Sequence, residues 1–65
     1  MCLAKRIKLY LVENDMTQKW LANKIGMDND KLCMTLNGNR KMSAEEFAKI
    51  IVALQVPAET FIKTD

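Results

Sequence analysis

The chain has 65 residues, of which 49% are apolar and 28% are charged, with only two glycines and one proline. This composition is typical of one small folded domain and excludes a disordered or low-complexity chain. A chain this short buries only about 60% of the surface that its unfolded form exposes. Such a thin core leaves no room for a deep cavity, so we expect neither an enzyme nor a small-molecule site.

Location is predicted from the apolar runs and from the first residues. The longest apolar run, 50–54, is far shorter than the roughly 20 residues that cross a bilayer. The first residues lack an apolar stretch before a small-residue cleavage site, which a signal peptide requires. We therefore expect a cytoplasmic protein that does not contact a membrane.

The chain has no histidine and two cysteines, Cys2 and Cys33. Without imidazole, the usual general base and most zinc sites are excluded. In a reducing compartment we expect both cysteines as plain thiols, with Cys33 at the edge of the core. Asp28 and Asp30 have the spacing of a calcium loop, but the glycine and the closing glutamate of such a loop are missing. No metal and no cofactor are expected.

Apolar residues recur at helical spacing along the whole chain, which predicts an all-α fold. One apolar stripe predicts a first helix that runs to about Asn14, and it consists of Leu3, Ile7, Tyr10 and Leu11.

Three further helix starts share one pattern. A methionine precedes a Thr, Asp or Ser that can cap a helix, and an apolar residue follows at the fourth helical position as a hydrophobic staple. The three sets are Met16-Thr17 with Leu21, Met27-Asp28 with Leu32, and Met42-Ser43 with Phe47. Glu46 also completes a capping box with Ser43. Helices are therefore predicted to begin near residues 17, 28 and 43.

The expected helix ends follow from glycine and proline. Gly26, and the pair Asn37-Gly38, can take the left-handed conformation that ends a helix. Pro57 suits the first position of a short fifth helix that ends near Ile62. The fourth helix is expected over 44–54, with Phe47, Ile50, Ile51 and Leu54 facing the core. The sequence thus predicts a single domain, 1–65, of five short helices.

The second and third helices have the spacing of a helix-turn-helix. Ala22 is small where another helix must cross closely, and Gly26 supplies a positive φ in the turn. Leu32 then plugs the angle between the two helices from the third helix.

Three runs together carry a resemblance to a known family: TQKWLANKIG at 17–26, LNGNR at 36–40, and 50–54 followed by Val56-Pro57. Over roughly residues 3–62, the chain resembles the Cro/cI (XRE) repressor-like DNA-binding domain. The resemblance implies a lambda repressor-like fold and a phage or bacterial transcription regulator, a repressor or a Cro-like protein. It also implies double-stranded DNA as the partner, a homodimer at least on DNA, and a place in the bacterial cytosol or at the nucleoid.

The resemblance also implies which residues contact DNA. The positions that face base edges are Asp28, Asn29, Asp30 and Met34. The positions that touch phosphates are Thr17, Gln18, Asn37, Gly38, Asn39, Arg40 and Lys41. The chemistry fits these roles, because helix N-termini present free amides to phosphate and Gly38 allows a close backbone approach. Asn29 can pair with adenine, and Asp30 can accept from cytosine N4.

Alternative roles are open for several of these residues. Asp28 is also the expected N-cap, and Asp30 also interacts favourably with the helix dipole. Because this edge is acidic and has no arginine for guanine, we expect weak DNA affinity or the need for a dimer. Many family members pair an arginine in helix one with a glutamate in helix three. Leu11 and Leu36 stand there instead, an exchange that is often neutral or stabilising.

A rival function uses the same fold as a protein-interaction module. Trp20 lies on helix two away from the apolar face, and an exposed tryptophan is typical of a partner surface. The same ring could instead lie over Lys24. Together with the acidic third helix, Trp20 would then bind a protein without reading bases.

Overall fold

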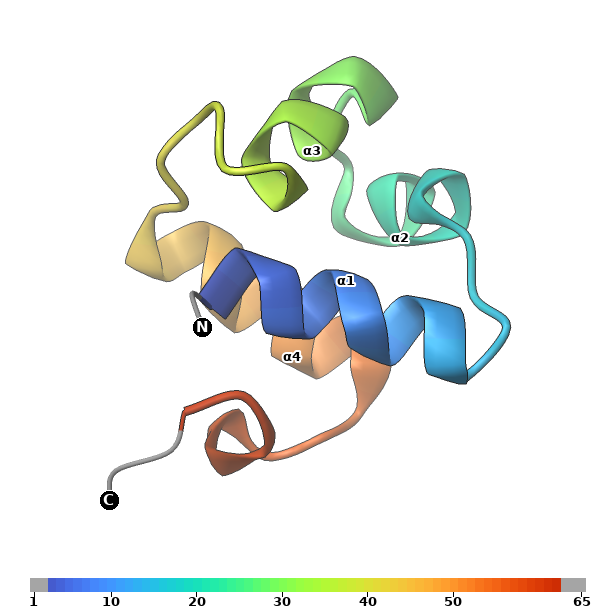
Figure 1. Ribbon diagram of the computed structural model, residues 1–65, viewed down its shortest axis with the longest axis vertical. Coiled ribbons are helices and arrows are strands. Elements are labelled where there is room, and N and C mark those ends of the chain that lie inside the picture. The colour runs from blue at the N-terminus through green and yellow to red at the C-terminus, as the bar shows by residue number, and fades with distance from the viewer. Residues whose placement is uncertain (1–2, 63–65) are drawn as a thin grey trace.

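The computed structural model describes residues 3–62 of the chain. This part contains four α-helices and one turn of 3-10 helix (Figure 1). No strand occurs in that part. The elements in chain order are α1 (Leu3–Glu13), α2 (Gln18–Ile25), α3 (Asn29–Leu36), α4 (Ala44–Leu54) and the 3-10 turn η1 (Ala58–Thr60). None of these helices has the length and apolarity needed to cross a bilayer.

The predicted helix starts are confirmed, with one difference in how they are capped. The Thr17 hydroxyl accepts the N–H of Trp20 at 3.0 Å, and Ser43 and Glu46 form both halves of the predicted capping box. Asp28 lies at the N-cap of α3 with an extended backbone, but its side chain makes no cap hydrogen bond. The expected Asp28 cap bond is therefore wrong, since this exposed carboxylate stays in water.

The helix ends also lie close to their predicted places. Gly26 ends α2 in the left-handed conformation (φ 69°), and Gly38 has a φ of 83° just after α3. α1 ends at Glu13, one residue earlier than expected, and Asp15 takes a left-handed φ of 56° in the turn that follows. Asn37 itself has a φ of −89°, so the left-handed residue after α3 is Gly38.

The predicted short fifth helix is present only as the single 3-10 turn η1, which ends before Ile62. Pro57 lies at the N-cap of η1 and not in its first helical position. The N–H of Thr60 donates to Pro57 O and that of Phe61 to Ala58 O, both at 3.0 Å, which is the 3-10 pattern. The turn ends at Phe61, whose ring packs into the core and leaves the residue 2% exposed.

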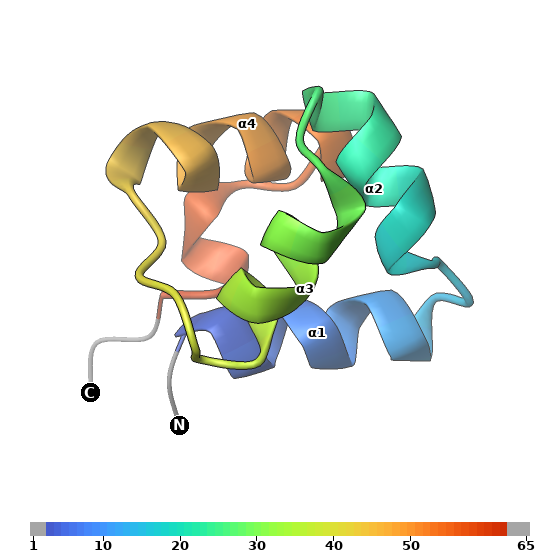
Figure 2. The same cartoon turned by 90° about the horizontal axis from the view of Figure 1, so that it is seen from above.

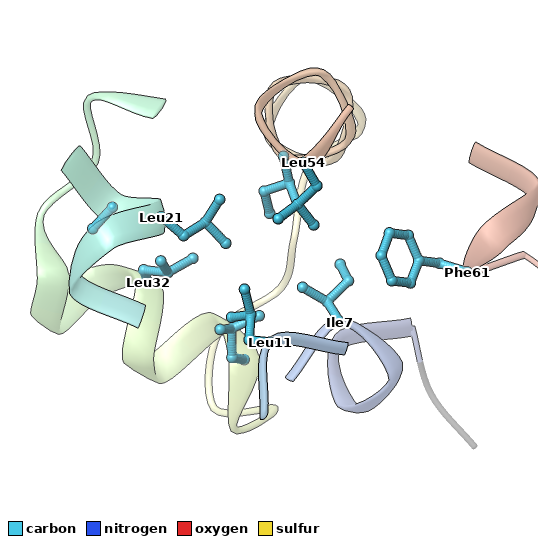
Figure 3. Close-up of a cluster of buried hydrophobic side chains, with 9 residues drawn as sticks. Ile7, Leu11, Leu21, Leu32, Leu54 and Phe61 are labelled. Atoms are coloured by element: carbon cyan, nitrogen blue, oxygen red, sulfur yellow. The ribbon is translucent and has the colours of Figure 1, made fainter. Parts of the chain in front are cut away.

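The helices surround one apolar core, with α2 and α3 on one side and η1 on the opposite side (Figure 3). α1 and α4 form the two remaining sides, as the two perpendicular views show (Figures 1 and 2). Of the four α4 residues expected to face the core, Ile50 and Leu54 are buried, and Phe47 and Ile51 are partly buried. The buried apolar residues are Ile7, Leu11, Leu21, Ala22, Leu32, Leu36, Ile50, Leu54 and Phe61.

Two features of this core bear on the site. Leu11 and Leu36, which stand in place of an ion pair, are both only 2% exposed and belong to the core. The methionines of the three staples, Met16, Met27 and Met42, are partly buried and pack against it. At the start of α2, α3 and α4, an apolar side chain directly before the cap thus packs against the core.

Candidate nucleic-acid interface

α2 and α3 pack against each other across a turn of three residues. Gly26 and Met27 both donate their backbone N–H to the Ala22 carbonyl, Met27 at 2.9 Å, so the end of α2 is closed by the turn itself. Ala22 is 2% exposed and Leu32 is fully buried, so the two helices meet through small and apolar side chains. This packing fixes the direction of α3 relative to α2 and leaves its opposite face in water.

The exposed face of α3 carries all four of the predicted base-reading residues. Asp28, Asn29 and Asp30 are exposed at the start of the helix, and Met34 is 47% exposed about one turn further on. The first helical bond is the one from Leu32 N–H to Asp28 O. Since Asp28 makes no cap bond, the N–H groups of the first turn remain open to an external acceptor.

The start of α2 brings together the two predicted phosphate contacts Thr17 and Gln18. The Thr17 hydroxyl oxygen accepts a bond from Trp20, which leaves the hydroxyl proton free to donate. Thr17 is exposed and Gln18 is half-buried. A helix start of this kind offers open N–H groups and the positive end of the helix dipole to an anion.

The loop after α3 uses its backbone amides to close that helix. Asn37 N–H donates to Cys33 O, Gly38 N–H to Thr35 O, and Asn39 N–H to Met34 O, at 2.9–3.2 Å. These three amides are therefore occupied. A contact from residues 37–39 to a phosphate would have to use side chains, and Asn37 and Asn39 are both exposed.

Arg40, another predicted phosphate contact, is bound within the protein. Its guanidinium donates to both carboxylate oxygens of Glu46, at 3.0 and 2.8 Å, and to the Thr35 hydroxyl at 3.0 Å. Thr35 is 1% exposed, the only buried polar residue in the described part of the chain, and its hydroxyl donates to Lys31 O. Together with the Ser43 N–H, which donates to Glu46 at 2.9 Å, these residues form what we call the Arg40 cluster.

The charges of the Arg40 cluster stabilise each other. The hydrogen bond from Arg40, followed by that from the Ser43 backbone, lowers the pKa of Glu46 from an ordinary 4.5 to about 2. The same hydrogen bond with Glu46 raises the pKa of Arg40. The cluster thus joins the second half of α3, the loop and the start of α4, and it holds the loop against both helices.

Sequence reasoning missed the Arg40 cluster. Of the contacts of Glu46, only the capping box with Ser43 was predicted, because that contact is local. Arg40 and Glu46 are six residues apart across a loop, a spacing that belongs to no regular element. Thr35 carried no signal at all, since a threonine within a helix is usually read as surface.

A second missed contact joins α1 to the loop. Lys8 Nζ donates to Asn37 Oδ1 at 2.7 Å, and the Asn37 amide donates to Cys33 Sγ at 3.3 Å. Cys33 is a half-buried free thiol, as expected at the core edge. Cys2 lies outside the described residues. Within residues 3–62, no group of three or more Cys, Asp or Glu side chains is placed to hold a metal ion.

The position of Trp20 agrees with both alternatives from the sequence, a partner surface and a contact with Lys24. Lys24 Nζ lies 5.8 Å from the centre of the indole ring, within the range of a cation–π contact. Trp20 is nevertheless 36% exposed and borders a shallow hollow with Asp15, Met16 and Thr17. The ring is thus partly covered by a lysine and partly open to solvent.

Comparison with protein-family models, with curated proteins and with solved structures gives no match for this chain. Function is therefore inferred from the arrangement of α2, α3 and the loop after them, and from the resemblance carried by 17–26 and 36–40.

Proposed function

We propose that the chain is a sequence-specific binder of double-stranded DNA, a transcription regulator of the repressor or Cro-like kind. In this proposal α2 and α3 form a helix-turn-helix within a lambda repressor-like domain. α3 enters the major groove, with Asn29, Asp30 and Met34 at base edges. The chain then acts as a homodimer at least on DNA.

One observation carries the proposal: α3 packs against α2 across the Gly26 turn, and the first turn of α3 is exposed to solvent. A recognition helix needs this arrangement, because its N-terminal residues must reach base edges while the preceding helix crosses the backbone. The open N–H groups at the start of α2, with exposed Thr17 beside them, support a phosphate contact there. Three exposed polar side chains that can donate to or accept from bases lie on the first turn of α3.

The test is binding to a fluorescently labelled duplex of mixed sequence, followed by anisotropy at low and at moderate salt. We expect binding at low salt that weakens steeply as salt rises, since each phosphate contact releases counterions. Selection from a random duplex pool should then enrich a preferred site. Absence of salt-dependent binding even at low ionic strength would contradict the proposal.

The second candidate, a protein-interaction module on the same fold, is favoured by the exposure of Trp20 and by the acidic start of α3. Asp28 and Asp30 repel phosphate at the place where base reading is proposed. The same duplex titration separates the two candidates. If the chain does not bind the duplex, the protein-interaction module is favoured. Trp20→Ala should then leave the protein folded but weaken its binding to the protein partner.

A further inference from the structure

One of the cations beside the end of α3 comes from α1. The loop after α3 descends to the N-terminal half of α1 before it turns back towards α4 (Figure 2). At that point Lys8 Nζ contacts Asn37 Oδ1 at 2.7 Å, although the two residues are 29 positions apart. A positive charge from the first helix is therefore placed on the loop that the proposed function assigns to the DNA backbone.

Arg40, the arginine of that loop, is poorly suited to bind an external anion. Its three hydrogen bonds go to Glu46 and Thr35, and the Glu46 carboxylate compensates its charge. These bonds leave two of the five guanidinium N–H groups free. A phosphate that accepted from them would lie beside the Glu46 carboxylate, which repels it.

Lys8 has the opposite properties. Among residues 3–62, its ammonium has a neutral amide as its hydrogen-bond partner and no carboxylate within ion-pair distance. An ammonium carries three N–H donors, so two remain after the bond to Asn37. Its charge is not compensated locally, and the contact with Asn37 restricts where it lies. Asn37 is itself held by its bond to Cys33 Sγ.

We infer that Lys8 is a phosphate-contacting residue, positioned by Asn37, and that Arg40 holds the loop in place without contacting DNA. This inference rests on the proposed function. It assigns a contact with the DNA backbone to α1, which lies outside the α2–α3 unit. The residue that makes this contact is then Lys8 of α1 and not Arg40 of the loop.

The test compares the salt dependence of duplex binding for three variants, using the same labelled duplex of mixed sequence. Lys8→Gln keeps a side chain that can reach Asn37 but removes the charge. Lys8→Arg keeps the charge. Lys5→Gln is the matched control, since it removes one positive charge from an exposed residue about one turn earlier on the same helix.

We expect Lys8→Gln to reduce the slope of log K against log salt by about one, as loss of one phosphate contact does. Lys8→Arg should keep the wild-type slope. Lys5→Gln should weaken binding less than Lys8→Gln and change the slope little. Melting temperatures should stay close to wild type in all three variants, because the contact with Asn37 is exposed.

The outcomes separate this inference from the proposed function. If the wild-type chain binds the duplex but Lys8→Gln and Lys5→Gln behave alike, the specific contact of Lys8 is wrong and the proposed function stands. If Lys8→Gln keeps the wild-type slope, the inference is likewise overturned. If the wild-type chain binds no duplex at low salt, both are overturned.

Discussion

At the scale of single residues, Gly26 determines the geometry of the turn between α2 and α3. Its φ of 69° lies in the left-handed region, and a Cβ built on it would meet no atom within 4 Å. A side chain at this position is therefore opposed by backbone conformation and not by a clash. A substitution here tests the conformation of the turn alone.

We expect Gly26→Val to lower the free energy of unfolding by about 2–3 kcal/mol, since a β-branched residue is strained at positive φ. Gly26→Asn is the control and should cost less than about 1 kcal/mol, because asparagine tolerates this region. Chemical denaturation followed by circular dichroism measures both values. Equal values for the two variants would contradict the turn geometry.

Glu46 is the residue through which pH should act on stability. Its pKa is about 2 in the folded protein and 4.5 ordinarily, so folding favours its ionised form. The sign follows from linkage: this contribution is fully present above pH 4.5 and is lost as the pH falls towards 2. Below that range the protonated acid no longer holds Arg40.

We expect Glu46→Gln to lower the free energy of unfolding at neutral pH by about 1 kcal/mol, a value kept small by solvent screening. Glutamine can still form the capping box, so the variant isolates the contact with Arg40. The difference from wild type should shrink as the pH falls from 4.5 to 2. The measurement is thermal or chemical unfolding across that range.

Glu45→Gln is the matched control for this pH series. The Glu45 side chain is 81% exposed, and its oxygen lies 3.5 Å from Lys49 in an ordinary surface pair. Such pairs contribute little to the free energy of unfolding. If Glu45→Gln lowered stability as much as Glu46→Gln, the Arg40 cluster would not be the source of the effect.

At the scale of whole elements, two helices are followed by a non-glycine residue with a positive φ, Asp15 after α1 and Gln55 after α4. Gln55 closes α4 with a left-handed φ of 58°, and its N–H donates to the carbonyls of Ile51 and Val52. Its side chain is exposed. A glycine would relieve the strain and keep both hydrogen bonds, because they use only the backbone.

We expect Gln55→Gly to raise the free energy of unfolding by about 0.5 kcal/mol, which is the relief of strain less the extra entropy of an unfolded glycine. Ala48→Gly, at an exposed position inside α4, should instead lower it by about 1 kcal/mol. Thermal unfolding of the two variants side by side checks this. A loss of stability in Gln55→Gly would show that its side chain contributes more than its backbone costs.

α3 combines the proposed base-reading face with an end that is held to the rest of the protein. Asn29→Ala and Met34→Ala should each weaken binding to the selected site by about 1–3 kcal/mol and change binding to mixed-sequence duplex little. Asp30→Asn distinguishes the two roles open for Asp30. A gain on all duplexes means a purely electrostatic role, whereas a loss on the selected site alone means that Asp30 accepts from cytosine.

These base-reading variants need a comparison that affects backbone contacts only. Lys41→Gln serves, since Lys41 is exposed in the loop and is a predicted phosphate contact. It should weaken binding to every duplex alike. If Asn29→Ala and Lys41→Gln weakened binding equally on all sequences, the separate roles of Asn29 in reading bases and of Lys41 in contacting the DNA backbone would be contradicted.

For the molecule as a whole, a single recognition helix with the eight residues of α3 would cover few base pairs. We therefore expect two copies to bind two-fold related half-sites about one helical turn apart. Footprinting should reveal a repeated, inverted pattern, and sedimentation should detect a dimer on the duplex. A single half-site that is not repeated would contradict this expectation.

Features of the fold that depend on neighbours within about one helical turn could be predicted from the amino-acid sequence. Examples are the capping box of Ser43 and Glu46 and the left-handed end of α2 at Gly26. Caps, staples and helix ends are local, so their residues lie three or four positions apart and can be recognised in the chain. The bounds of α4, predicted as 44–54, agree with the structure for this reason.

Contacts between side chains that are far apart in the chain are found only in the folded protein. Arg6 donates to the Phe61 carbonyl at 3.0 Å across 55 positions, and Phe61 packs edge-on against Tyr10 and Phe47. The same holds for the contact of Lys8 with Asn37. These contacts depend on how four helices close around one core, since packing brings together residues with no fixed spacing in the chain. The sequence predicts a phosphate contact for Arg40, and only the folded chain shows that its guanidinium binds Glu46 and Thr35.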